Sequence, residues 1–305
     1  MENTIGATMI MYKSMKVSDL EIFYREAGST SSPAIVLLHG FPASSHMFRD
    51  LIPALEDQFY LIAPDYPGFG NSSMPPQDRF EYSFDNLAEI TDQLIQALGL
   101  NKYSLYVMDY GAPIGFRIAT KHPEQVESLI IQNGNAYEQG LRDFWAPLKA
   151  YWEDRSAENE AALRKFLTPE ATKWQYTTGA RNPGAISPDG PNMDAYFLSR
   201  PGNDRIQLEL FYSYGSNPPL YPKWQAYFRQ YQPATLIVWG RNDPIFPAEG
   251  AYPYQSDLEN IDFNLLDTGH FALEEDYEAI ADHIRKFFAS RVLKGEEGVY
   301  RAEAR

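Results

Sequence analysis

The sequence predicts an α/β protein with a mostly parallel, doubly wound sheet and an inserted helical cap. Short apolar runs recur along the chain, and several lack clean alternation, as expected for strands covered by helices on both faces. Amphipathic helical segments fall between these runs, and one central region contains no convincing buried strand. The expected strands cover residues 19–24, 34–38, 60–63, 103–108, 126–132, 235–239 and 261–266.

Two segments show strong helical periodicity. In residues 84–98 Leu87 and Leu94 fall on one apolar stripe, and residues 277–292 repeat the pattern with Ile280 among the stripe positions. Because strands and helices alternate along the chain, we expect a sheet whose ligands bind at the carboxyl ends of its strands.

The alternation breaks between residues 137 and 221, where helical pieces rich in Trp, Tyr and Pro occur. We therefore expect three parts. Residues 1–136 form the first part of the sheet domain, residues 137–221 form the helical cap, and residues 222–305 complete the sheet domain.

Composition excludes several classes of protein. The chain has 305 residues, a net charge of −15 and no cysteine. Its acidity and the lack of a Lys/Arg cluster argue against nucleic-acid and membrane-surface partners. Without cysteine there is no disulfide, thiolate zinc site or cysteine nucleophile. No targeting segment or run of 18 apolar residues is present, so the cytoplasm is the default expected location, and the oligomeric state is not readable.

A strand that turns abruptly into a helix places a carboxylate at the turn. The segment Leu105-Tyr-Val-Met-Asp-Tyr-Gly-Ala-Pro-Ile-Gly115 puts Asp109 at this point. In a strand–nucleophile–helix arrangement such a side chain projects above the sheet, and a small residue two places later, here Gly111, lets strand and helix pass closely. The alternative is that Asp109 merely caps the following helix.

The segment His39-Gly-Phe-Pro42 directly follows the apolar strand 34–38 and has the form of an oxyanion loop. Backbone N–H groups of Phe41 and of Tyr110, the residue after Asp109, would together face a developing oxyanion. The alternative is an ordinary Gly-Pro turn after a strand.

An acid and a histidine follow two successive strands. Asp243 lies in Gly240-Arg-Asn-Asp-Pro-Ile-Phe246, and His270 lies in Asp267-Thr-Gly-His-Phe271. A histidine held by a carboxylate through one ring nitrogen acts as a base through the other. The other four histidines lie in expected helices or in the loop that starts at His39, which leaves His270 as the best base. Each residue alone also fits a turn or a structural role.

These motifs together resemble the α/β-hydrolase superfamily, and within it the epoxide hydrolase and haloalkane dehalogenase branch. They are His39-Gly-Phe-Pro42, Asp65-Tyr-Pro-Gly-Phe-Gly70, Met108-Asp-Tyr-Gly111, Gly240-Arg-Asn-Asp243 and Thr268-Gly-His-Phe271. The resemblance covers nearly the whole chain and implies an α/β-hydrolase fold with a helical lid over the catalytic face. It also implies that Asp109 is the nucleophile, His270 the base and Asp243 the acid that orients the base.

An aspartate nucleophile selects the chemistry. Carboxylate attack on an ester would give an anhydride, whereas attack on an sp³ carbon that bears a strained oxygen or a halide gives an alkyl ester. Water activated by His270 would then hydrolyse that ester, with the Phe41 and Tyr110 N–H groups stabilising the oxyanion on Asp109. The expected partners are a small apolar epoxide or halide and water, and no metal or organic cofactor is required.

The epoxide and halide interpretations differ in the group that stabilises the leaving atom. In epoxide hydrolases two cap tyrosines do so, and the resemblance implies Tyr176 and Tyr214 here, with Tyr212 competing for the second position. Dehalogenases use a Trp and an Asn at the positions that Tyr110 and Phe41 occupy in this chain. Trp145 and Trp174 are expected in the lid core or the substrate-binding wall.

The sequence therefore predicts a hydrolase that opens epoxides to vicinal diols through an ester on Asp109. The first alternative is a haloalkane dehalogenase with the same three catalytic residues. The second is a small-molecule binding protein that keeps the fold without turnover.

Overall fold

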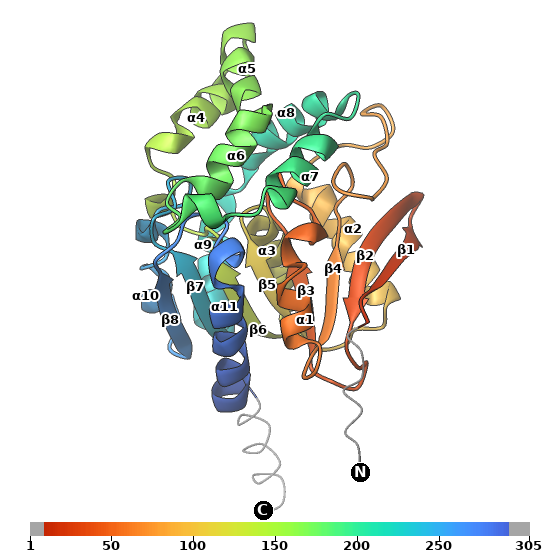
Figure 1. Ribbon diagram of the computed structural model, residues 1–305, viewed down its shortest axis with the longest axis vertical. Coiled ribbons are helices and arrows are strands. Elements are labelled where there is room, and N and C mark those ends of the chain that lie inside the picture. The colour runs from red at the N-terminus through yellow and green to blue at the C-terminus, as the bar shows by residue number, and fades with distance from the viewer. Residues whose placement is uncertain (1–8, 293–305) are drawn as a thin grey trace, which may run out of the picture.

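The computed structural model describes residues 9–292 and contains one eight-stranded sheet. The strand order is β1-β2-β4-β3-β5-β6-β7-β8 (Figure 1). The pairs β1–β2 and β2–β4 are antiparallel, and every other neighbouring pair is parallel. The strands are β1 Met11–Val17, β2 Leu20–Ala27, β3 Ala34–Leu38, β4 Tyr60–Pro64, β5 Tyr103–Met108, β6 Val126–Gln132, β7 Ala234–Gly240 and β8 Ile261–Leu266. The outer ends of the first and last predicted parts, residues 1–8 and 293–305, lie outside the described residues.

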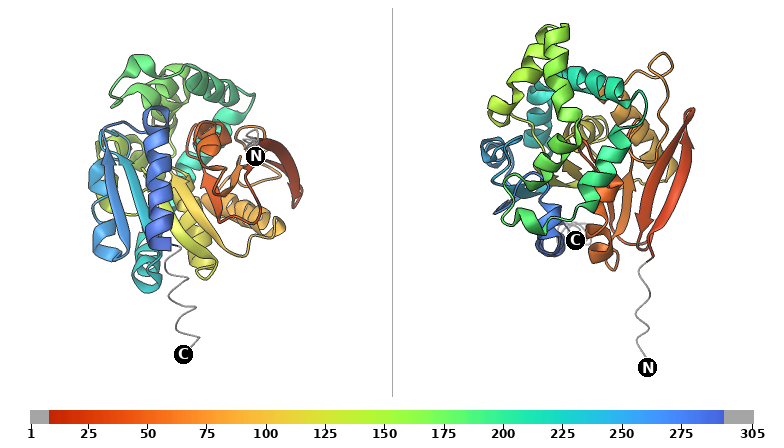
Figure 2. Two further views of the ribbon diagram at one scale, coloured as in Figure 1. Left: turned by 60° about the horizontal axis from the view of Figure 1, so that its bottom comes forward. Right: turned by 45° about the horizontal axis from the view of Figure 1, so that its top comes forward.

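Helices cover both faces of the sheet, which explains the apolar central strands. Every residue of β3, β4, β5 and β7 is buried. On one face α2, α3 and α9 share a hydrophobic core that includes Phe84, Phe116 and Trp224. On the other face α1 and α11 enclose a second core that includes Leu51 and Ile284. Figure 2 shows the blue helix α11 lying against this face of the sheet. The helices of the sheet domain are α1 Leu51–Leu55, α2 Phe84–Ala97, α3 Gly111–Lys121, α9 Tyr221–Tyr231, α10 Tyr254–Asp257 and α11 Leu273–Phe287, with turns η1 Ser45–Phe48, η8 Ala248–Gly250 and η9 Phe288–Val292.

The segment between β6 and α9 is helical and lies over one end of the strands (Figure 1). Its helices are α4 Ala146–Glu153, α5 Ala157–Arg164, α6 Pro169–Thr177, α7 Asp189–Leu198 and α8 Asn203–Ser213, joined by the short turns η2 Glu138–Gly140, η3 Asp143–Trp145, η4 Lys165–Leu167, η5 Pro183–Ala185, η6 Tyr214–Ser216 and η7 Pro218–Leu220. The predicted helical insertion is therefore confirmed. Across residues 9–292, no helix is long and apolar enough to cross a membrane.

Polar contacts attach the cap to the sheet domain at several places, two of which lie near the ends of the cap and of α6. Arg117 of α3 donates to the Asn217 side chain at 2.7 Å, beside the end of the cap. Arg181, in the connection after α6, pairs with Asp276 of α11 at 2.7 Å. These contacts hold the cap over the ends of β5, β7 and β8, where the candidate catalytic residues lie.

Strand β1 was not predicted. Its residues pair one by one with β2, from Met11 opposite Glu26 to Val17 opposite Leu20. It is an edge strand whose side chains are mostly exposed or half-buried, so it lacks the apolar run that identifies a core strand. The helix predicted from residue 277 begins formally at Leu273, but Asp276 has non-helical dihedral angles, so the regular part starts where the periodicity indicated.

Candidate active site

Asp109 lies at a strained turn between β5 and α3. Its φ of +50° is in the left-handed region, which costs a residue with a Cβ atom energy and is typical of functional sites. The turn is tight because glycines surround it. A Cβ on Gly111 would lie 2.2 Å from the carbonyl oxygen of Leu38. A Cβ on Gly40 would lie 2.4 Å from the Cβ atom of Asp109. The backbone therefore brings the loop after β3 directly against Asp109.

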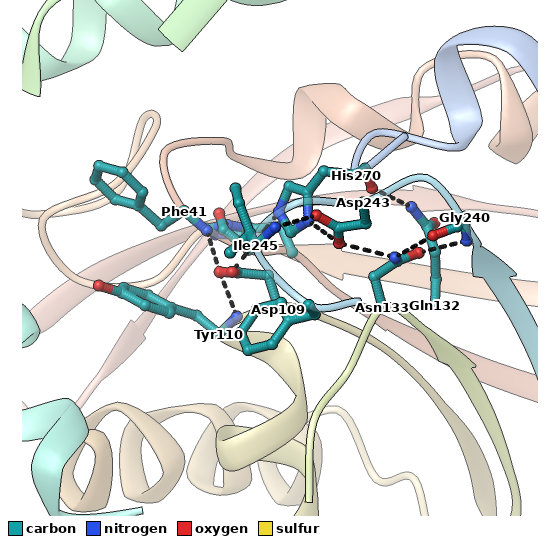
Figure 3. Close-up of polar contacts among 12 residues, drawn as sticks. Phe41, Asp109, Tyr110, Gln132, Asn133, Gly240, Asp243, Ile245 and His270 are labelled. Carbon is teal, nitrogen blue, oxygen red and sulfur yellow. Dashed lines mark hydrogen bonds and ion pairs between the residues drawn. The ribbon is translucent and has the colours of Figure 1, made fainter. Parts of the chain in front are cut away.

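Two backbone N–H groups hold one oxygen of Asp109 (Figure 3). Its Oδ1 accepts from the amide of Phe41 at 2.7 Å and from the amide of Tyr110 at 2.6 Å. The other oxygen, Oδ2, lies 3.7 Å from Nε2 of His270. The two carboxylate oxygens are thus distinguished, with Oδ1 in a two-donor oxyanion hole and Oδ2 turned toward the histidine.

His39 supports this loop and is not a base. Its Nδ1 lies 2.9 Å from the carbonyl oxygen of Gly40, and its Nε2 accepts weakly from the amide of Tyr66 at 3.4 Å. The Tyr66 ring stacks on the imidazole at 4.1 Å, and its hydroxyl donates to the His39 carbonyl. Burial lowers the pKa of His39 to about 3, so the ring stays neutral.

His270 is oriented by Asp243. The two side chains meet at 2.7 Å between Nδ1 and Oδ2 (Figure 3). Since a neutral Nδ1–H donates to this carboxylate, Nε2 is left with a lone pair and faces Asp109. The Oδ1 of Asp243 accepts from the amide of Ile245 at 2.7 Å, so both oxygens of Asp243 are occupied.

Asn133 also holds Asp243, and the sequence analysis missed it. Its Nδ2 donates to Oδ2 of Asp243 at 2.8 Å, and its Oδ1 accepts from the amide of Gly240 at 2.9 Å. The preceding Gln132 donates to the carbonyl oxygen of His270 at 3.3 Å. Both are buried polar residues at the carboxyl end of β6. The rule that located Asp109, a polar residue where a buried strand ends, would have located them.

Burial and neighbouring charges shift the pKa values of Asp109 and His270. Burial raises the pKa of Asp109, although the charge of His270 and the two backbone N–H groups oppose this. Burial acts to lower the pKa of His270, but the charge and hydrogen bond of Asp243 outweigh it, and the net pKa lies above its usual value. Asp243 thus stabilises the protonated form of His270.

A narrow cavity of about 30 Å³ opens onto Asp109 between the sheet domain and the cap. Its polar side chains are Asp109, Tyr110, Trp145 and Gln175, and the Trp145 indole already donates to the carbonyl oxygen of Ile245 at 2.8 Å. The rest of the wall is apolar and consists of Phe41, Phe144, Leu148, Phe166, Phe211 and Ile245.

Of the three residues predicted to bind substrate, only Trp145 lines this cavity. Trp174 is 38% exposed and stacks on the outer side of the wall against Phe144. Tyr212 is 40% exposed and packs its ring under Arg155 at 4.5 Å. The prediction for Trp174 and Tyr212 is therefore corrected. The aromatic composition of the insert and the family resemblance located them on the cap, but neither shows which side of a helix faces the cavity.

Tyr176 is directed away from Asp109, which corrects its prediction as a catalytic donor. Its hydroxyl donates to Oδ2 of Asp194 at 2.6 Å, and its ring stacks on Phe271 at 3.8 Å. The phenol therefore belongs to the buried contact between α6, α7 and the loop that carries His270. Gln175, the residue before it, takes the place at the cavity wall.

Tyr214 and Tyr110 lie together beside Asp109. Their ring centres are 5.9 Å apart, and the Tyr214 ring also contacts Trp145 at 4.5 Å. Within residues 9–292 neither hydroxyl has a hydrogen bond of ordinary geometry, although the hydroxyl of Tyr221 lies near that of Tyr214. Burial raises both pKa values well above the usual one, so both phenols stay protonated. In the described part of the chain, no group of three or more His, Cys, Asp or Glu side chains could hold a metal ion.

Comparison with known proteins identifies relatives along most of the chain. A family model described as the alpha/beta hydrolase fold matches residues 33–277. The chain is 42% identical over 285 residues to "Uncharacterized hydrolase YNR064C" of Saccharomyces cerevisiae, covering 91% of this chain and 97% of that protein. It is 28% identical over 288 residues to "Haloalkane dehalogenase 2" of Mycobacterium tuberculosis, covering 88% and 91%. The solved structure of "Epoxide hydrolase CorEH without ligand" superposes with a TM-score of 0.74 over 92% of this chain and 99% of that chain, and its 22% identity shows likeness of fold alone.

Asp243→Asn is expected to move the pH dependence of the base. His270 accepts a proton from water only when neutral, so activity falls as the pH drops through its pKa. Removing the Asp243 charge lowers that pKa, and the acidic limb of the rate profile should shift to lower pH. The plateau rate should fall by about 10³-fold or more, because asparagine does not stabilise the protonated ring. Rates measured between pH 5 and 9 check this, and an unmoved limb would contradict the pairing.

Asp194→Asn is expected to flatten the pH dependence of stability. Burial raises the pKa of Asp194 to about 7, although the Tyr176 hydrogen bond opposes the shift. An unfolded aspartate titrates near pH 3.9, so the folded chain binds more protons between about pH 4 and 7 and loses stability as the pH rises through that window. Urea unfolding at pH 5 and pH 8 should show a smaller decline in the variant, and an equal decline would place the titration elsewhere.

Proposed function

The chain belongs to the alpha/beta hydrolase fold family, and we propose that this hydrolase opens small epoxides to vicinal diols through an ester formed on Asp109. The observation that carries the proposal is that the two oxygens of Asp109 have different contacts. Oδ1 accepts two backbone N–H bonds, while Oδ2 lies toward the base His270. A carboxylate held in this way is suited to accept an alkyl group on one oxygen and an oxyanion on the other.

In the first step Oδ2 of Asp109 attacks an epoxide carbon. A C–O bond of the ring breaks, and the ring oxygen leaves as an alkoxide that takes a proton. The buried phenols of Tyr110 and Tyr214 support this step, because their hydroxyls are neutral and lack a partner of ordinary geometry, and Tyr110 also lines the cavity at Asp109. The product is a hydroxyalkyl ester of Asp109.

In the second step water attacks the carbonyl carbon of that ester. His270 takes the proton through Nε2, and the charge develops on Oδ1 between the amides of Phe41 and Tyr110. Collapse breaks the bond between the carbonyl carbon and Oδ2. The diol leaves with Oδ2 and with the proton returned by His270, and Asp109 keeps the oxygen of water. The second proton of that water leaves Asp109 and restores the phenol that donated in the first step.

Phenol donors favour an epoxide over a halide. An alkoxide needs a proton near neutral pH, and a neutral phenol supplies one, whereas a halide ion leaves without protonation. Phe41 offers no side-chain donor, and the indole of Trp145 is already bonded to Ile245. The second candidate is haloalkane dehalogenase, which the curated Mycobacterium relative favours.

The narrow cavity also bears on the substrate. A narrow cavity with a mostly apolar wall favours a small apolar substrate, and a larger one needs the cap side chains to move apart. We therefore propose short-chain epoxides as the first compounds to test.

His270→Ala is expected to trap the ester, because alkylation does not use the base and hydrolysis does. Intact-mass measurement after exposure to 1,2-epoxybutane should show a gain equal to the whole epoxide. A gain equal to a butyl group less one hydrogen, seen only with 1-bromobutane, would instead establish the dehalogenase.

The matched control is the double variant Asp109→Ala with His270→Ala, which should gain no mass. Peptide mapping of the single variant should locate the adduct on Asp109. An adduct elsewhere, or no adduct with either compound, would contradict the proposed mechanism.

A further inference from the structure

We infer that the Gln175 side chain binds the atom that leaves the substrate carbon, donating an amide N–H to the oxygen as the epoxide opens. This inference rests on the proposed function and assigns a role that the sequence had given to Tyr176. Gln175 lies on α6 of the cap and lines the same cavity as Asp109.

The first observation is an unpartnered polar group in the cavity wall. Gln175 is only 5% exposed, and within residues 9–292 its carboxamide forms no hydrogen bond, although its polar atoms are not fully enclosed by protein. A largely buried amide without a hydrogen-bond partner is energetically unfavourable. Contact with a bound molecule in the cavity removes that cost, so the position favours a ligand-binding role.

The second observation is how α6 divides its buried side chains. Thr172, Gln175 and Tyr176 are its buried residues. Consecutive helical residues point about 100° apart, so Gln175 and Tyr176 face different surroundings. Tyr176 is bound to Asp194 and stacked on Phe271, away from the nucleophile, while Gln175 reaches the cavity.

The direction of attack determines where the leaving oxygen lies. Displacement at an sp³ carbon proceeds in line, so the bond that breaks points away from Oδ2 of Asp109. Asp109 belongs to the sheet domain and Gln175 to the cap, and both line the cavity. A substrate carbon next to Oδ2 therefore directs its leaving oxygen toward the cap.

Other donors near this position are already engaged. The Trp145 indole donates to Ile245, and the amides of Phe41 and Tyr110 donate to Asp109. In the described chain Gln175 is thus the only cap side chain at the cavity wall with free N–H groups. A carboxamide does not release a proton near neutral pH, so Gln175 stabilises the growing charge while a phenol supplies the proton.

The experiment measures the two half-reactions separately. In the His270→Ala background, the rate of ester formation with 1,2-epoxybutane is followed by quenched intact-mass measurement for Gln175→Leu and for Gln175→Met, which has nearly the length of glutamine. Both should form the ester about 100-fold more slowly, the effect of removing one donor from a developing oxyanion. The concentration for half-maximal rate should change less than threefold, because the bond strengthens only as charge develops.

Thr172→Val is the matched control. Thr172 is buried on the same helix face but does not line the cavity. Its ester-formation rate should stay within twofold of the His270→Ala parent. With His270 restored, the hydrolysis step should keep its rate in Gln175→Leu. A general loss of structure would instead slow both steps.

The outcomes separate this inference from the proposed function. Ester formation at the parent rate in both Gln175 variants would overturn the role of Gln175 and leave the aspartyl-ester mechanism standing. Slower hydrolysis with normal ester formation would also overturn it, since Gln175 would then act on water. Absence of an ester in the parent itself would overturn the proposed function.

Discussion

The structure depends on how the backbone holds Asp109. Two amide N–H groups bind its Oδ1, which leaves Oδ2 as the free oxygen beside His270. This arrangement requires the left-handed turn at Asp109 and the near contact with Gly40. The strain is local, and the two buried cores on either side of the sheet hold it in place.

Buried polar contacts extend this constraint to the other catalytic groups. Asp243 would be costly to bury alone, but it receives bonds from His270, Asn133 and the amide of Ile245. Every one of these partners comes from the end of a strand or the loop after it. The sheet therefore fixes Asp109, Asp243 and His270, whereas the cap supplies most of the apolar wall.

The sequence was sufficient for the parts that local rules determine. Buried parallel strands are apolar runs, so seven of the eight strands were found, and polar residues at their ends identified Asp109, Asp243 and His270. The edge strand β1 was missed because its exposed side chains carry no such run. In the cap, neighbouring positions such as 175 and 176 have similar burial but face different partners, and that difference comes from tertiary packing.

The most direct measurement is a single turnover of a small epoxide in H₂¹⁸O with the enzyme in excess. If Asp109 forms an ester that water cleaves at the carbonyl carbon, the diol carries no ¹⁸O and the peptide containing Asp109 gains one ¹⁸O atom. If the diol carries ¹⁸O and Asp109 gains none, water attacks the epoxide directly, and the account of Asp109 as nucleophile is wrong.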